Sequence, residues 1–180
     1  MKPIWTDPLT WILVVLLAIV LAFAGPRSHP ALGRLPADIG EKLGKVPAAA
    51  VREDDRMIMV LTFRRDQRQA AENWIRGLRL HEHAVAWVRM PVVDDPGEPA
   101  LRAEAEGRLL ARYAGPGERN NLLPLITNRA TFVQSTGLRD TSQASVLVIN
   151  RRGDVLARVV GEYDTDKAAV VMDTVRQQEL

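Results

Sequence analysis

The fold is decided by residues 144–155, which read ASVLVINRRGDV. Val146–Ile149 is an uninterrupted apolar run of strand length, and residues 150–154 have the composition of a tight hairpin turn. Val155–Val160 is therefore expected to return as the antiparallel partner strand. The C-terminal third thus begins with a buried β-hairpin.

A final helix follows this hairpin. Asp164 or Thr165 is placed to cap its N-terminus. Its inner face carries apolar residues at helical spacing: Ala168, Val171, Met172 and Val175. The helix is expected to cover one face of the hairpin.

Upstream, Met57–Phe63 reads MIMVLTF, which is typical of a strand that is buried on both faces. A helix is predicted next, with Asp66 as its N-cap and Gln69 in capping-box spacing. Its buried face combines four residues at i, i+3, i+4 and i+7: Ala71, Trp74, Ile75 and Leu78. Val85–Val93 is predicted to be a second strand, parallel to the first.

The middle of the chain is predicted to be mainly helical. An amphipathic helix is marked by Leu101, Ala105, Leu109 and Tyr113, and residues 115–117 (GPG) break it. Leu122–Ile126 is predicted as a short strand, and Ala130–Thr136 as a short helix that Gly137 ends. The order β-α-β, helices, β-hairpin-α predicts an α/β fold with a mixed sheet between helices, as in thioredoxin.

The sequence resembles the thioredoxin-like superfamily and, within it, the Atp10-like group, which assembles the mitochondrial F-type ATP synthase. Residues 60–74, residues 110–138 and the terminal hairpin with its helix carry this resemblance. Where redox thioredoxins have two cysteines, this chain has residues 65–69 (RDQRQ), and Ala144-Ser145 stands where they have a cis-proline. The resemblance therefore implies a thioredoxin scaffold without thiol chemistry.

Composition excludes several function classes. The chain has no cysteine, which rules out disulfides, thiolate metal sites and cysteine nucleophiles. Of 24 basic and 22 acidic residues, the first fifty positions hold five and three, so 19 of each remain beyond Ala50. A balanced domain of this kind gives no indication of nucleic-acid binding.

The N-terminal segment, residues 1–25, is predicted to be a single-pass membrane anchor. Pro8–Gly25 carries no charge, and Trp5 and Trp11 are placed for the membrane interface. Basic residues after this segment favour a cytoplasmic domain on the inner membrane. The alternative is a signal peptide cleaved after Ala24, which would release a periplasmic binding domain.

Residues 26–55 are rich in proline and glycine and are predicted to be a linker, with a short helical turn around Asp38–Leu43. The thioredoxin-like domain is predicted to span residues 56–180. Candidate partner-binding residues lie in the anchor, the linker and the start of the first helix: Trp5, Trp11, Arg27, Arg34, Arg64, Arg65 and Arg68.

Two acidic or histidine clusters have simpler explanations than metal binding. Residues 81–83 (HEH) offer two ligands at most and are expected to be a polar helix end. Asp94-Asp95 could hold a cation, but the sequence Asp-Asp-Pro-Gly is typical of a turn. No catalytic set, cofactor site or metal site is predicted.

The sequence thus predicts a non-catalytic accessory or assembly subunit of a membrane protein complex, such as an ATP synthase or a respiratory or photosynthetic complex. Its partners would be integral membrane subunits and the lipid bilayer, and no small-molecule substrate is identified. The alternative is a membrane-tethered enzyme with non-thiol chemistry, which would need a polar pocket near Asp66 or Asp94.

Overall fold

The computed structural model describes residues 31–43, 56–82, 85–113, 119–139 and 141–177. These residues belong to one compact unit, Pro30–Gln178. The predicted anchor, with Trp5 and Trp11, and Arg27 lie outside the described residues. Within the described ranges, no helix has the length and apolar character needed to cross a membrane.

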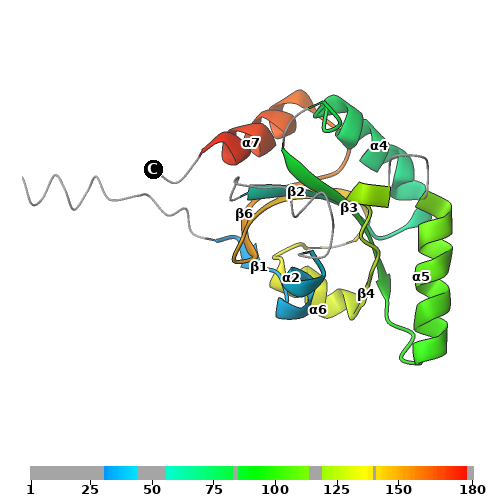
Figure 1. Ribbon diagram of the computed structural model, residues 1–180. Coiled ribbons are helices and arrows are strands. Elements are labelled where there is room, and N and C mark those ends of the chain that lie inside the picture. Colours follow the sequence, from blue (N-terminus) through cyan, green and yellow to red (C-terminus); the bar gives the residue numbers. More distant parts are fainter. Residues whose placement is uncertain (1–30, 44–55, 83–84, 114–118, 140, 178–180) are drawn as a thin grey trace, which may run out of the picture. The chain divides into compact units, whose positions relative to one another are not determined.

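A six-stranded mixed sheet forms the centre of this unit (Figure 1). In spatial order its strands are β1 (Gly33–Arg34), β6 (Asp154–Val160), β5 (Ser145–Asn150), β2 (Arg56–Thr62), β3 (Ala86–Asp94) and β4 (Leu125–Thr127). β2, β3 and β4 run parallel, whereas β5 is antiparallel to β2, β6 to β5 and β1 to β6. The predicted parallel βαβ unit and antiparallel hairpin are both confirmed.

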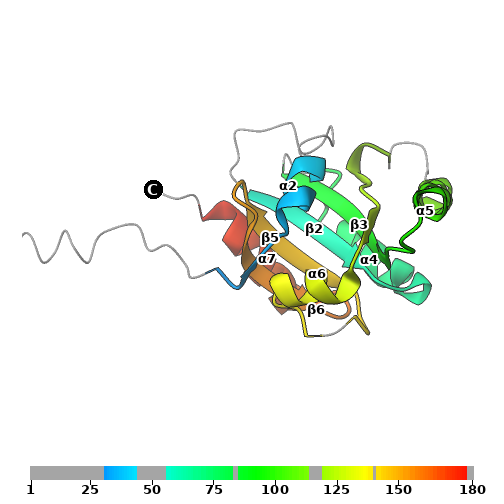
Figure 2. The same ribbon diagram turned by 90° about the horizontal axis from the view of Figure 1, so that it is seen from below.

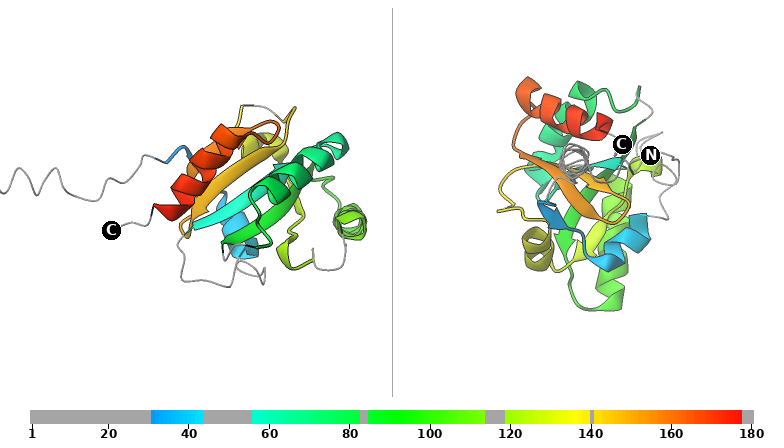
Figure 3. Two further views of the ribbon diagram at one scale, coloured as in Figure 1. Left: turned by 90° about the horizontal axis from the view of Figure 1, so that it is seen from above. Right: turned by 90° about the vertical axis from the view of Figure 1, so that its left-hand side faces the viewer.

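Helices cover both faces of the sheet. α4 (Arg68–Gly77) and α7 (Thr165–Arg176) lie across one face, and α2 (Ala37–Leu43) and α6 (Arg129–Ser135) cover the other (Figures 1, 2 and 3). α5 (Pro99–Tyr113) stands beside the sheet near β4. Short 3-10 turns, η2 (Arg65–Gln67) and η3 (Arg119–Asn121), join these elements. The arrangement fits a thioredoxin-like fold.

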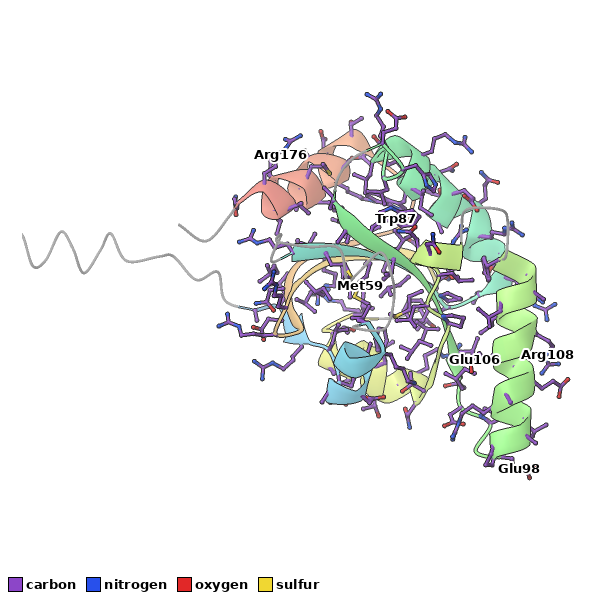
Figure 4. All side chains as sticks on the ribbon, viewed as in Figure 1. Met59, Trp87, Glu98, Glu106, Arg108 and Arg176 are labelled. Atoms are coloured by element: carbon purple, nitrogen blue, oxygen red, sulfur yellow. The ribbon has the colours of Figure 1, made fainter. Side chains whose placement is uncertain are left out.

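The sheet is buried on both faces, which explains the unbroken apolar run in β2. Ile58 and Val60 pack against Trp74 of α4 and Val171 of α7. The alternate β2 residues, such as Met59, pack against the helices of the opposite face. Figure 4 shows Trp87 on the α4 side and Met59 on the α2 side. Burial on both faces is what a parallel strand between two helical layers requires.

Residues 31–43 also belong to the folded unit, although their composition resembles that of a linker. β1 pairs with β6, and Leu35, Ile39 and Leu43 are buried in the core beneath the sheet. The expected helical turn is present as α2. Gly33 is required because a Cβ atom there would lie 2.6 Å from the backbone carbon of Thr136.

The hairpin and the last helix form as predicted. Gly153 adopts a φ of 79° in the turn between β5 and β6, a conformation that favours glycine. The Asp164 carboxylate accepts hydrogen bonds from the backbone N–H groups of Asp166 and Lys167, so it caps α7.

Candidate functional site

A cleft of about 510 Å³ opens at the C-terminal ends of β2 and β3, between the sheet and α5. This edge of an α/β sheet is where ligands most often bind. The cleft is lined by residues of β2 and the turn after it, of β3 and the loop after it, and of α5: Thr62, Phe63, Arg64, Arg65, Pro91, Val92, Val93, Asp94, Pro96, Leu101, Ala105, Arg108, Leu109, Arg112 and Tyr113.

One wall of the cleft is apolar and comes from α5. The residues that mark this helix as amphipathic, Leu101, Ala105, Leu109 and Tyr113, all line the cleft. Leu109 and Tyr113 are buried, whereas Leu101 is 43% exposed. The apolar face of α5 is therefore only partly used for packing, and its first half borders open space.

Four arginines give the cleft a positive rim: Arg64, Arg65, Arg108 and Arg112. Arg64 forms a 3.0 Å ion pair with Asp66, and Arg108 forms a 3.4 Å ion pair with Glu104. Within the described part of the chain, Arg65 and Arg112 form no ion pair. The cleft therefore carries positive charge that its own side chains leave uncompensated.

Asp94 is the acidic residue in the lining, and it is already engaged. Its carboxylate forms a 2.7 Å ion pair with Arg129 and accepts a hydrogen bond from the Arg129 backbone N–H. The neighbouring Asp95 accepts hydrogen bonds from Arg102 and from the Gly97 backbone, which together lower the pKa of its carboxyl group. Both aspartates thus stabilise the loop after β3, which agrees with the turn expected from the sequence Asp-Asp-Pro-Gly.

Thr62 contributes a buried hydroxyl group to the cleft wall. The residue is 2% exposed, and its Oγ1 atom has no hydrogen-bond partner in the described structure. Burying a hydroxyl without a partner costs free energy. The cleft wall therefore contains a buried hydroxyl group whose hydrogen-bonding capacity no described residue uses.

The turn from β2 into α4 is held by Gln67 rather than capped by Asp66. The buried Gln67 amide accepts a hydrogen bond from the Phe63 backbone N–H and donates one to the Thr141 carbonyl, at 2.7 and 2.8 Å. The predicted Asp66–Gln69 capping box is wrong, because residues 65–67 form a 3-10 turn and α4 begins only at Arg68. Asp66 is exposed and pairs with Arg64 instead.

A cluster of side chains around the buried Tyr113 ring fixes α5 against the rest of the domain. The guanidinium groups of Arg68 and Arg89 lie 5.6 and 5.1 Å from the centre of the Tyr113 ring. Arg89 also forms a 2.7 Å ion pair with Glu72 of α4. The Arg89 side chain is buried, so its cation–π contact with Tyr113 is made away from water and is stabilising. The cluster therefore holds the C-terminal end of α5 near the start of α4.

The predicted partner-binding residues are distributed over different parts of the molecule. Arg64 and Arg65 line the cleft, whereas Arg68 stacks over Tyr113 beside it. Arg34 lies in β1 at the opposite edge of the sheet, where it pairs with Asp154 at 2.8 Å. Sequence reasoning missed Arg108 and Arg112, although their spacing of four residues places them on one side of α5.

The histidine cluster has no described metal geometry. His81 packs edge-on against Trp87, with ring centres 5.1 Å apart, and His83 lies outside the described residues. Among the described residues, no group of three histidine, aspartate or glutamate side chains is arranged to hold a metal ion.

No protein-family model and no curated protein matches the chain. Solved structures similar to it include the exposed lipoprotein thioredoxin Etrx1 from Streptococcus pneumoniae, with 14% identity over 76% of this chain and 90% of that chain and a TM-score of 0.44. A thiol:disulfide interchange protein DsbE of Chlorobium tepidum has 15% identity, over 84% and 97% of the two chains, and a TM-score of 0.44. BsSco, a Sco-family cytochrome c oxidase assembly protein, has 11% identity, over 70% and 83%, and a TM-score of 0.43.

Proposed function

We propose that this protein is a non-catalytic accessory or assembly subunit of a membrane protein complex. It is held at the inner membrane by its N-terminal segment and binds its partner through a thioredoxin-like domain that has no thiol chemistry. An energy-transducing complex, such as an ATP synthase or a respiratory complex, is the partner class that the resemblance to the Atp10-like group implies.

The observation that carries this proposal is the turn between β2 and α4. In redox thioredoxins this turn holds the reactive cysteines, and here the whole chain has none. Gln67 instead ties the turn to Phe63 and Thr141 by hydrogen bonds. The turn that carries the reactive groups in redox thioredoxins is therefore held in place by hydrogen bonds in this chain. A turn held in this way is suited to serve as a binding surface.

The exposed side chains of this turn are charged. Arg64, Asp66 and Arg68 have side chains that are at least half exposed, and Arg65 is exposed beside them. Three arginines and one aspartate give this surface a net positive charge. It is therefore complementary to an acidic surface on the partner.

Site-specific photo-crosslinking in native membranes tests the proposal. A photoreactive amino acid replaces Asp66 in the turn, or Asp173 on α7 as a control with the same side chain and similar exposure. We expect the Asp66 probe to capture an integral membrane protein, and the Asp173 probe to capture none. Capture at neither position, or equal capture at both, would contradict the proposal. Purification in mild detergent is a second test, and migration of the protein alone at every growth stage would also contradict the proposal.

A further inference from the structure

We propose that the cleft between α5 and the sheet binds a small amphipathic carboxylate, meaning an aliphatic or aromatic tail that ends in a carboxylate group. This inference goes beyond the proposed function and does not depend on it. The cleft volume of about 510 Å³ falls in the range of small-ligand sites.

The cleft has two chemically different ends. α5 ends at Tyr113, which the Arg68 and Arg89 side chains hold near α4, so Arg112 lies at the α4 end. Leu101 lies eleven residues earlier, about 16 Å along the helix axis. Figure 4 shows Glu98 at the far end of α5 and Arg108 closer to α4. The cationic side chains that α5 gives to the cleft therefore lie in its second half, whereas its first half gives only Leu101 and Ala105.

Charge complementarity identifies the head group of the ligand. Arg65 and Arg112 line the cleft and form no ion pair with any described residue. A planar guanidinium group matches the geometry of a carboxylate. Asp94 does not supply that anion, because it is paired with Arg129 at 2.7 Å. Both side chains are exposed, so they are available to an anion from outside the chain.

The rest of the lining identifies the body of the ligand. Leu101, Ala105 and Leu109 of α5 and Pro91 and Val93 of β3 all line the cleft, and Val93 packs against the buried cluster that includes Leu109 at one side of it. These side chains offer apolar contact but no hydrogen bonds, so they favour a hydrocarbon or aromatic tail. A bound head group would reach the Thr62 hydroxyl, which has no described partner, only after a shift of the side chains that bury its Oγ1 atom.

Equilibrium dialysis of the full-length protein tests this site, with 6-phenylhexanoate as the probe and protein-free micelles as the blank. Two analogues of the probe are compared with it: the neutral isostere 6-phenylhexanamide and the cationic 6-phenylhexylamine. We expect the carboxylate to bind about tenfold more tightly than the amide and the amine to bind more weakly still. Equal binding of all three would overturn the proposal.

Two double variants locate the binding. Arg65→Gln with Arg112→Gln should weaken carboxylate binding at least about tenfold, because both free charges of the cleft are lost. Arg76→Gln with Arg139→Gln removes two exposed arginines that lie outside the cleft and should leave the affinity unchanged. Equal loss in both pairs, or binding of an acidic peptide such as acetyl-Glu-Asp-Glu-Leu-amide without binding of 6-phenylhexanoate, would overturn the assignment.

Discussion

The two edges of the sheet use arginine in opposite ways. At the β1 edge, Arg34 and Arg152 both contact the buried carboxylate of Asp154, at 2.8 and 3.1 Å. At the C-terminal ends of β2 and β3, beside α5, four arginines line a cleft whose acidic residue, Asp94, is already paired with Arg129.

The comparison separates structural charge from available charge. Arg34 lies in a two-residue strand and pairs with Asp154, so its loss should lower the unfolding free energy. Arg65 and Arg112 have no ion pair in the described structure, so their loss should lower the affinity for a ligand instead. The same residue type therefore gives no indication of its role until its neighbours are known.

Tyr113→Ala is expected to have the largest effect, because it removes the ring that joins α5 to α4. Loss of the buried side chain and of its two cation–π contacts should cost about 3 kcal/mol of unfolding free energy. Urea denaturation measures this change. Leu110→Ala, at an exposed position of the same helix, should cost less than about 0.5 kcal/mol. Equal costs would show that Tyr113 does not anchor α5.

Asp154→Asn tests the β1 edge of the sheet, where Asp154 pairs with Arg34 and Arg152. The substitution leaves Arg34 and Arg152 without their shared carboxylate and should lower the unfolding free energy by about 2 kcal/mol. Asp173→Asn removes an exposed carboxylate that pairs with Arg176 at 3.7 Å, and it serves as the control with an expected cost below about 0.5 kcal/mol. Comparable losses in chemical denaturation would argue against a structural role for Asp154.

The same edge should make stability depend on pH. Hydrogen bonds from Asn150 and then from Arg34 hold the pKa of Asp154 below its ordinary value of 3.8. A lowered folded pKa gives stability that is complete above the ordinary value and is lost as the pH falls through the folded pKa. Thermal unfolding between about pH 5 and pH 2 should therefore show a shallower decline for Asp154→Asn than for the wild type. Parallel curves would contradict this assignment.

The strands and most helices could be predicted from the sequence, because apolar runs and four-residue spacings report burial directly. The hairpin at residues 150–154 and the Asp164 cap are local features, so short-range chemistry determines them. Residues 31–43 are different. Their proline and glycine content indicates a linker, and only pairing of β1 with β6 and burial of Ile39 reveal their place in the fold.

The candidate site was only partly predictable for a related reason. Arg64 and Arg65 stand out beside a helix start, but Arg112 looks like any solvated residue of an amphipathic helix. The predicted Asp66 cap is wrong because residues 65–67 form a 3-10 turn, held by the buried Gln67, and α4 begins only at Arg68. A cleft depends on how α5 is held away from the sheet, and that position depends on Tyr113, Arg68 and Arg89, which are far apart in sequence.

Thr62→Val distinguishes a hydroxyl kept for a ligand from one kept for folding. Because Oγ1 has no described partner, removing it should leave the unfolding free energy unchanged or raise it by up to about 1 kcal/mol. Thr136→Val is the matched control, since the Thr136 hydroxyl donates a 2.8 Å hydrogen bond to the Phe132 carbonyl, and its loss should cost about 1 kcal/mol. A cost at Thr62 as large as that at Thr136 would count against the proposal.

The smallest effect on folding is expected for the arginines of the cleft. Arg65→Gln combined with Arg112→Gln should change the unfolding free energy by less than about 0.5 kcal/mol, because neither side chain forms an ion pair with a described residue. Differential scanning calorimetry against Arg76→Gln with Arg139→Gln measures this. Clear destabilisation by the cleft pair alone would mean that these arginines support the fold.

Hydrogen exchange of the full-length protein, with and without 6-phenylhexanoate, compares the two edges in one measurement. If the cleft holds the carboxylate, added probe should slow amide exchange in residues 63–67 and in α5, and leave residues 150–154 unchanged. Slowed exchange at the Asp154 edge, or no change in α5 at a saturating concentration of probe, would contradict the assignment of the cleft as the open, ligand-binding edge of this fold.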